Sequence, residues 1–480
     1  MSALGQRLAE HGEKAKAHPF TDDGNATRLI ERHRDQIRFV AKWGTWLTWD
    51  GRRWQEDPDA NAVTNLCRRL LRDEAVNLHA LAQKLEKSEE KSDRAKSQTY
   101  RSTARSLGSL KTIRAAVSLA ATDPSIYVDP DDLDARPQLL NVANGTIDLA
   151  TGVLRAADPA DLLTKCVDVN YVTGTESSKW EAFLARVLPD RDVRDYVQTL
   201  VGYALTGHVR EQICVFLIGT GANGKTVFVN TLQRVFGEYH AVGRPDVLVA
   251  TRNDTHPTYV ARMKGARLVT IAELDQGAKV DEAQLKILTG GDRLEARRMR
   301  EDPWEFDPTH QIVVMSNHKP EVKGTDEGIW RRIRLIPFDV TIPFHDRDPN
   351  LAADIAAEID GVLAWAVEGA TRYLTEGLGE LPTHVDLATA SFRSEQNQIL
   401  RFCEDRGYVL TGNQTDSETF GAIWGDYQAW AHEAGERLDS QRTFGENLAK
   451  AGAKPDKFGG FRVRRGIRKT RTTDAFLGSS

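Results

Sequence analysis

The residues best suited to chemistry in this sequence lie in one glycine-rich stretch. Gly219 is followed, after four intervening residues, by Gly224, Lys225 and Thr226. Glycines let the backbone curl so that successive N–H groups face one anion, a lysine can reach the outer phosphates of a nucleotide, and a threonine hydroxyl can ligate magnesium. We therefore expect a phosphate-binding loop; the alternative is a glycine-rich turn without a ligand. The expected contacts are Gly219, Thr220, Gly221, Ala222, Asn223, Gly224, Lys225 and Thr226.

Two later segments carry the polar groups that a bound nucleotide needs. The apolar run from Leu268 to Ala272 ends at Glu273, and Asp275 follows two residues later. Because side chains alternate along a strand, both carboxylates are expected on one face. Glu273 is the better metal ligand, whereas Asp275 is either a second ligand or a turn residue. Another apolar run ends at Asn317, whose amide could hold the attacking water or sense the terminal phosphate, although either strand end could also be ordinary.

Three arginines, Arg331, Arg332 and Arg334, precede a further apolar segment. They could form a solvated edge. The more specific interpretation is that one of them reaches the γ-phosphate bound by a neighbouring subunit. Such an arginine can raise the rate of hydrolysis by roughly 10³- to 10⁵-fold. An arginine that acts in this way requires a ring of subunits.

The hydrophobic pattern predicts the elements that position these groups. A buried strand at 215–219 leads into the glycine-rich loop, and a helix starts directly after it. Upstream, "WLTWDGRRW" is typical of a β-hairpin, and 61–121 has a helical pattern. Near the C-terminus, two helices and a basic, glycine-punctuated hairpin suggest a winged helix that could contact duplex or forked DNA.

Composition limits the class of protein. The chain has 480 residues, 40% of them hydrophobic, which is enough for two to four domains. A net charge of -5 excludes a uniformly basic coat but not local basic patches. Its four cysteines are far apart, so neither zinc nor disulfides are expected. No apolar run approaches the roughly 20 residues of a membrane span, and the N-terminus lacks a signal peptide, so we expect a cytoplasmic protein without membrane contact.

Five motifs in order give a family resemblance. "GTGANGKT", "LVTIAELDQG", "LKILTGGDRLEARRM", "VVMSNHKP" and "GTDEGIWRRIRLIPF" closely resemble the superfamily 3 helicases of phages and plasmids, in the branch that includes the poxvirus primase-helicase. The resemblance covers most of 29–340. It implies an ATP- and Mg²⁺-dependent hexameric helicase on single-stranded DNA, with Lys225 and Thr226 in Walker A, Glu273 in Walker B, Asn317 as sensor 1 and Arg332 as the arginine finger, with Arg331 as its competitor. Metal contacts would come from Thr226, Glu273 and Asp275.

The same resemblance gives an α/β fold class with an AAA+-type P-loop core and an N-terminal α+β helicase-associated domain, and the C-terminal pattern adds a winged-helix-like domain. The expected division is a polar tail at 1–25, the helicase-associated domain at 26–175, the ATPase core at 176–345, a helical connector at 346–392 and the winged-helix-like domain with its basic tail at 393–480.

Two basic groups are candidates for DNA contact. The family carries a hairpin that points into the ring's pore, and here Arg297, Arg298 and Arg300 lie at its turn, with Lys286 as a weaker candidate. The alternative is an exposed hairpin stabilised by pairing with Glu295 and Glu301. The C-terminal group consists of Lys457, Arg462, Arg464, Arg465 and Arg468.

Other functions remain open from the sequence. A DNA-binding initiator or loader would use ATP only as a switch, but the apparent hydrolytic set argues against it. Priming would need a carboxylate cluster for two metals, and "DPDDLDARP" has a loop-like setting instead. We therefore expect any primase to be a separate chain, and the host element to be a phage, satellite or plasmid.

Overall fold

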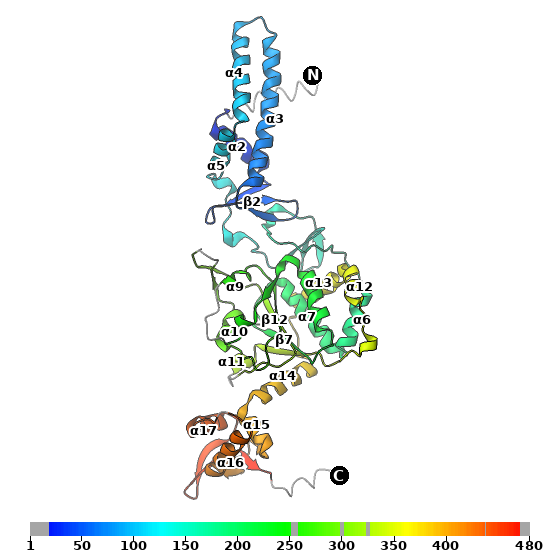
Figure 1. Cartoon of the computed structure of the whole chain (residues 1–480), viewed down its shortest axis with the longest axis vertical. Helices are drawn as coiled ribbons and strands as arrows, with labels where there is room; N and C mark the ends of the chain where they lie inside the picture. Colours follow the sequence, from blue (N-terminus) through cyan, green and yellow to red (C-terminus); the bar gives the residue numbers. More distant parts are fainter. Residues whose placement is uncertain (1–18, 251–257, 298–301, 323–326, 437, 471–480) are drawn as a thin grey trace.

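Three bodies follow one another along the long axis of the molecule (Figure 1). The structure is a computed structural model that describes residues 19–250, 258–297, 302–322, 327–436 and 438–470. A helical N-terminal body lies at one end, a central α/β body follows, and a small C-terminal domain lies at the other end.

The N-terminal body combines a small sheet with helices. Its elements are α2 (Asp22–His33), β1 (Ile37–Val40), β2 (Thr45–Trp49), β3 (Trp54–Asp57), α3 (Asn61–Glu86), α4 (Lys91–Leu107) and α5 (Leu110–Ala120). β1, β2 and β3 form an antiparallel sheet, which confirms the tryptophan-rich hairpin. The side chain of Thr21 caps α2, so the predicted tail to residue 25 extended too far into a helix.

A second small sheet joins this body to the centre. β4 (Leu139–Val142), β5 (Gly145–Asp148) and β6 (Val153–Arg155) are antiparallel. Leu140, Val142 and Ile147 belong to the same hydrophobic cluster as the helices that cover the central sheet. This strand group therefore shares a core with the central body. Short 3₁₀ turns occur at Pro124–Ile126, Pro130–Asp132, Pro159–Asp161, Gly237–Tyr239, Pro245–Val247 and Phe344–Asp346.

The central sheet is entirely parallel. Its strands are β7 (Cys214–Ile218), β8 (His240–Gly243), β9 (Leu268–Ala272), β12 (Gln311–Ser316) and β13 (Ile333–Pro337), in the spatial order β13-β7-β12-β9-β8. On β7, Val215 and Leu217 enter one hydrophobic cluster, whereas Cys214, Phe216 and Ile218 enter another on the opposite face. Both faces are thus buried, as a parallel sheet requires.

Helices cover both faces. The first face packs on α6 (Ser178–Val187), α7 (Arg191–Thr206), α8 (Lys225–Phe236), α12 (Leu351–Ala357) and α13 (Ile359–Glu376). The other carries α9 (Thr258–Ala261), α10 (Glu282–Leu288), α11 (Glu327–Trp330) and α14 (Thr383–Gln396). The hairpin of β10 (Leu294–Ala296) and β11 (Trp304–Phe306) is antiparallel.

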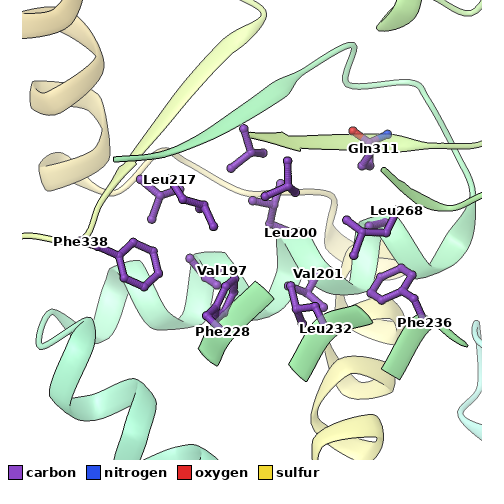
Figure 2. A pocket seen from close by; sticks show the side chains of 14 residues that line it. Val197, Leu200, Val201, Leu217, Phe228, Leu232, Phe236, Leu268, Gln311 and Phe338 are labelled. Carbon is purple, nitrogen blue, oxygen red and sulfur yellow. The ribbon is translucent and has the colours of Figure 1, made fainter. Parts of the chain in front are cut away.

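A small gap remains between the sheet and its helices. Figure 2 shows Val197, Leu200 and Val201 from α7 on one side of it, with Phe228 and Leu232 from α8. Its volume is about 30 Å³, and Gln311 is the polar residue among an otherwise apolar lining. A space of this size holds at most a single water and is a packing gap in the core, not a ligand site.

The C-terminal domain has its own core. It consists of α15 (Gln398–Asp405), β14 (Tyr408–Leu410), β15 (Ser417–Thr419), α16 (Phe420–Glu433), α17 (Gln441–Lys450), β16 (Lys454–Phe458), β17 (Phe461–Arg465) and β18 (Ile467–Lys469). Phe402, Tyr427 and Phe444 pack together at its centre. β15, β17 and β16 form an antiparallel sheet, so β16 and β17 are the predicted basic hairpin.

The four cysteines are free and buried. None of the helices in the described part of the chain combines the length and the apolar character that a bilayer span requires.

The close approach of α7 and α13 gives a stability prediction. A Cβ added at Gly202 would lie 2.0 Å from the backbone of Ala370 and of Gly369, which cannot move aside as a side chain can. We expect Gly202→Ala to lower the free energy of unfolding by roughly 2 kcal/mol or more, measured by chemical and thermal denaturation. Gly425→Ala on α16 is the control: its Cβ would meet nothing within 4 Å, so a gain of roughly 0.5–1 kcal/mol is expected. Equal effects of the two changes would contradict the packing argument.

Candidate functional site

The glycine-rich loop connects β7 to the start of α8. Gly221 and Gly224 have φ of +110° and +86°, in the region that favours glycine. At Gly219 the constraint is space, because a Cβ would lie 2.2 Å from Nδ2 of Asn223 and 2.3 Å from the carbonyl oxygen of Phe338. Since α8 begins at Lys225, the free N–H groups of its first turn lie at this loop.

Lys225 is the central residue of the site. It is only 4% exposed, and its Nζ donates to the Gly219 carbonyl (2.6 Å), to Oδ1 of Asn223 (3.2 Å) and to Oδ1 of Asn317 (3.1 Å). Burial lowers the pKa of Lys225. These acceptors are neutral, and within the described chain no carboxylate pairs with the ammonium group. An uncompensated buried cation favours an anion at this position.

A cavity of about 560 Å³ opens beside Lys225. Part of its lining is polar and comes from 221–227 of the loop and helix, from Glu273, and from Met315, Ser316 and Asn317 at the end of β12. The rest comes from α6 and the segment after β13, where Phe183 and Ile342 are apolar. Between these two segments Arg186 pairs with Asp346 at 3.0 Å. A lining with both polar and apolar parts suits a ligand that has both a phosphate part and a flat organic part.

The structure separates the two predicted carboxylates. Glu273 lines the cavity, but it has φ +50° and its N–H donates to the carbonyl of Met315 (2.8 Å). β9 therefore ends at Ala272, and the alternation of side chains stops there. Leu274 is buried, and Asp275 does not line the cavity. The structure thus places Glu273 and not Asp275 at the cavity, and a shared face for the two carboxylates stays a prediction.

The residues present fit a nucleotide-bound magnesium ion. Among the described residues, no group of three or more His, Cys, Asp or Glu side chains could hold a metal by itself. Mg²⁺ bound with a nucleotide needs only one or two protein ligands, because phosphates and waters complete its coordination. Thr226 and Glu273 border the same cavity and supply a hydroxyl and a carboxylate.

The neighbouring arginines have opposite environments. Arg332 is 9% exposed, and its Nη1 donates to Oγ1 of Thr289 (3.2 Å) and to the Gln212 carbonyl (3.5 Å). Burial lowers the pKa of Arg332, with a smaller effect from the charge of Arg331. Arg331 is exposed. The prediction of Arg332 as the arginine finger therefore conflicts with its burial inside its own chain, and Arg331 is the accessible one.

The predicted DNA-contact residues also differ in their exposure to solvent. Arg297 is exposed at the end of β10, and Lys286 on α10 is half-buried, whereas Arg298 and Arg300 lie outside the described residues. In the C-terminal domain, Lys457, Arg462 and Arg468 are exposed.

Two of the C-terminal arginines have structural partners. Arg464 is buried over the ring of Phe420, 4.6 Å from its centroid, so the prediction that it contacts DNA is not supported. Arg465 pairs with Asp456 and donates to the Gln414 carbonyl (2.8 Å). Fewer basic side chains are therefore available on the surface of this hairpin than its sequence contains.

Sequence reasoning missed the part of the cavity lining that comes from α6 and from the segment after β13. Lys179, Phe183 and Arg186 come from α6, and Ile342 and Asp346 from the segment after β13. The sequence marks these residues only by their position, in a helix before the loop and in a turn after the last strand, because neither segment carries a fixed motif. Folding brings these two segments together at the loop.

Two parts of the chain match known families. Residues 26–189 are similar to a family described as D5 N terminal like. Residues 217–332 match a family of unknown function, DUF5906. Together these matches confirm the predicted resemblance to primase-helicase relatives.

Curated viral proteins align with this chain. "Putative helicase L207/L206" of Acanthamoeba polyphaga mimivirus is 28% identical over 347 residues, which is 69% of this chain and 35% of the relative. "Putative helicase 121R" of invertebrate iridescent virus 3 is 27% identical over 46% of this chain and 24% of its own length. "Putative primase C962R" of African swine fever virus is 24% identical over 45% of this chain and 24% of its own length. The chain thus spans about a third or less of these relatives, and a bacterial host stays a prediction.

A solved structure has the same overall fold. The apo structure of the NrS-1 C-terminal region aligns with a TM-score of 0.50 at 11% identity, over 89% of this chain and 95% of that one. At this identity the likeness concerns the fold alone.

The contact between Lys225 and Asn317 gives a charge prediction. Asn317→Asp places a carboxylate oxygen where the amide oxygen now lies 3.1 Å from Nζ of Lys225. The new ion pair neutralises the lysine, so we expect the affinity for ATP to fall about 10-fold or more, measured by titration with a fluorescent ATP analogue. Asn317→Ala, which removes only the hydrogen bond, should cost less. An Asp variant that binds ATP as tightly as the unmodified chain would contradict this view of the site.

Proposed function

We propose that this chain is an ATP-dependent replicative DNA helicase of a phage, satellite or plasmid that moves as a ring on single-stranded DNA. The observation that carries the proposal is the buried Lys225 ammonium group, which lines the cavity and is held by neutral oxygens among the described residues. The similarity to viral proteins that are named putative helicases also supports a helicase function.

The sheet supports an AAA+-type core. Counted along the chain from β7, the spatial order is fifth, first, fourth, third and second strand, with the glycine-rich loop after the first. Adjacent parallel strands end at the same edge, so this order brings the ends of β9 and β12 beside the loop that follows β7.

Each residue at this edge has a role in hydrolysis. Lys225 and the N–H groups at the start of α8 hold the β- and γ-phosphates. Asn317 lies next to Lys225 and orients the γ-phosphate or the attacking water, and Glu273 polarises that water. Thr226 and Glu273 would hold Mg²⁺, which neutralises phosphate charge when bound. Phe183 and Ile342, which are apolar residues of the cavity lining, contact the base.

The ring and its DNA contacts complete the proposal. Arg331 of one subunit acts on the nucleotide of its neighbour in a homo-oligomer, which we propose to be a hexamer. The hairpin of β10 and β11 grips the DNA backbone through Arg297 and the neighbouring Arg298 and Arg300. The C-terminal domain, a winged helix with β16 and β17 as its wing, contacts forked DNA.

A second candidate is the helicase part of a primase-helicase system. It is favoured by the alignment with a relative that is named a primase, of which this chain matches 24% of the length. In this form of the proposal, primer synthesis belongs to a part of the replication machinery outside the matched segment.

Loss of the lysine tests the motor. Lys225→Ala removes the charge that holds the phosphates, so we expect DNA-stimulated ATP hydrolysis to fall at least about 100-fold and unwinding to disappear, while DNA binding by the C-terminal domain remains. Phosphate release and strand-displacement assays measure the two activities. Lys84→Ala, an exposed lysine on α3, is the matched control and should change neither. Unwinding that survives Lys225→Ala would overturn the motor assignment and leave a DNA-binding ATP switch.

Subunit mixing tests which arginine acts in trans. Arg331→Ala and Lys225→Ala chains are each expected to be inactive, and a mixture should recover part of the hydrolysis because some interfaces then combine an intact Lys225 with an intact Arg331. Arg332→Ala is expected instead to lower the melting temperature, because it removes the buried contacts with Thr289 and Gln212. Recovery with Arg332→Ala and not with Arg331→Ala, after verified subunit exchange, would reverse the assignment.

A further inference from the structure

Two phenylalanines are exposed at the end of the hairpin formed by β16 and β17. Phe458 and Phe461 face each other across the turn Gly459–Gly460, and they are 68% and 67% exposed. Both glycines have positive φ, +57° and +84°, which allows the tight turn. We call residues 457–462 the wing tip. It belongs to the domain at the far end of the molecule from the N-terminal body (Figure 1).

The fold of the domain does not depend on these two rings. The other aromatic side chains of this domain pack inward, as Phe402, Tyr427 and Phe444 do. The hairpin is held further down by buried Val463, by the pair of Arg465 with Asp456, and by Arg464 over Phe420. Phe458 and Phe461 therefore present apolar area to water without stabilising the core, which is typical of a binding surface.

The charges around the rings are positive. Lys457 and Arg462 are opposite each other in the register, directly next to the Phe pair, and both are exposed. The nearby carboxylate of Asp456 is paired with Arg465, further down the hairpin. Because side chains alternate along a strand, the two rings lie on one face of the hairpin and the two cationic side chains extend from the other face.

This combination selects a class of ligand. Cations attract a polyanion, and flat aromatic faces stack on flat bases, which is how proteins hold single-stranded nucleic acid without reading its sequence. In a duplex the bases are stacked on each other and their faces are covered. We infer that the wing tip binds unpaired bases of DNA by stacking on Phe458 and Phe461, while Lys457 and Arg462 attract the phosphates from the other face of the hairpin.

At a fork this contact falls where the strands separate. A base that has lost its partner can stack on Phe458 or Phe461 instead of returning to the duplex, so the wing tip favours the open form of the junction. The inference rests on the DNA-binding part of the proposed function. It does not depend on hydrolysis, because the tip belongs to a domain with its own core.

The experiment compares DNA binding by tip variants of the full chain. Fluorescence anisotropy is measured without nucleotide on a fork with unpaired arms and on a blunt duplex with the same number of phosphates. Changing both Phe458→Ala and Phe461→Ala should weaken binding to the fork about 10-fold or more and leave the duplex affinity within about 2-fold, since stacking is lost but the charges remain. A fluorescent base analogue in the unpaired arm should lose its stacking-dependent signal with the same variant.

Three controls separate stacking from other causes. Phe458→Trp with Phe461→Trp keeps flat rings and should keep fork binding, whereas Phe458→Leu with Phe461→Leu keeps apolar volume without a π face and should lose it. Leu438→Ala removes an exposed apolar side chain elsewhere in the domain and should have no effect. Circular dichroism verifies the fold of each variant.

Unchanged fork binding by the double Ala variant would overturn the inference, and so would full binding by the Leu variant. Loss of binding to anionic phospholipid vesicles, or loss of self-association, together with intact fork binding would assign the tip to a membrane or to a protein contact instead. The hydrolysis rate without DNA is recorded in parallel. Its absence in the unmodified chain would refute the proposed motor without affecting the comparison of tip variants.

Discussion

The buried ammonium group of Lys225 is the interaction on which the rest of the site depends. A cation that is 4% exposed and surrounded by neutral oxygens is stable only because three of them point at it, from Gly219, Asn223 and Asn317. Each partner has its own structural requirement, because Gly219 must lack a Cβ and Asn317 must end β12 beside β7. The parallel sheet, buried on both faces, holds these strand ends together.

The same strand ends are tied to the C-terminal domain. Beyond Asn317, Lys319 pairs with Glu395 of α14 at 2.7 Å, and the N–H of Val322 donates to Gln396. Glu321 bonds through its backbone to Ala278 and Val280, in the segment that follows Glu273. The segments after β9 and β12 are therefore joined to each other, and both reach the point where Asn397 caps α15. The lining of the cavity is thus connected by short covalent and hydrogen-bonded links to the start of the domain that carries the wing tip.

Burial decides between residues that the sequence cannot distinguish. Arg331 and Arg332 are adjacent and chemically identical, but the turn after α11 leaves one exposed and directs the other to Thr289 and Gln212. Glu273 and Asp275 differ because the backbone of Glu273 is left-handed, which ends the alternation of β9. In the basic hairpin, Arg464 lies over Phe420 while Arg462 is exposed. Side-chain direction at a strand end is fixed by tertiary contacts, so residue type and spacing alone could not predict these outcomes.

The sequence by itself determined the features that are local in the chain. These are the glycine-rich loop between β7 and α8, the strands that directly precede Glu273 and Asn317, and the basic C-terminal hairpin, because short-range backbone preferences and hydrophobic periodicity specify them. Only the tertiary structure decided the strand order, the contact of Lys225 with Asn317, the apolar part of the cavity lining and the exposure of Phe458 and Phe461. These features join segments far apart in the chain, or depend on what covers a side chain, and burial and long-range pairing are properties of the folded packing.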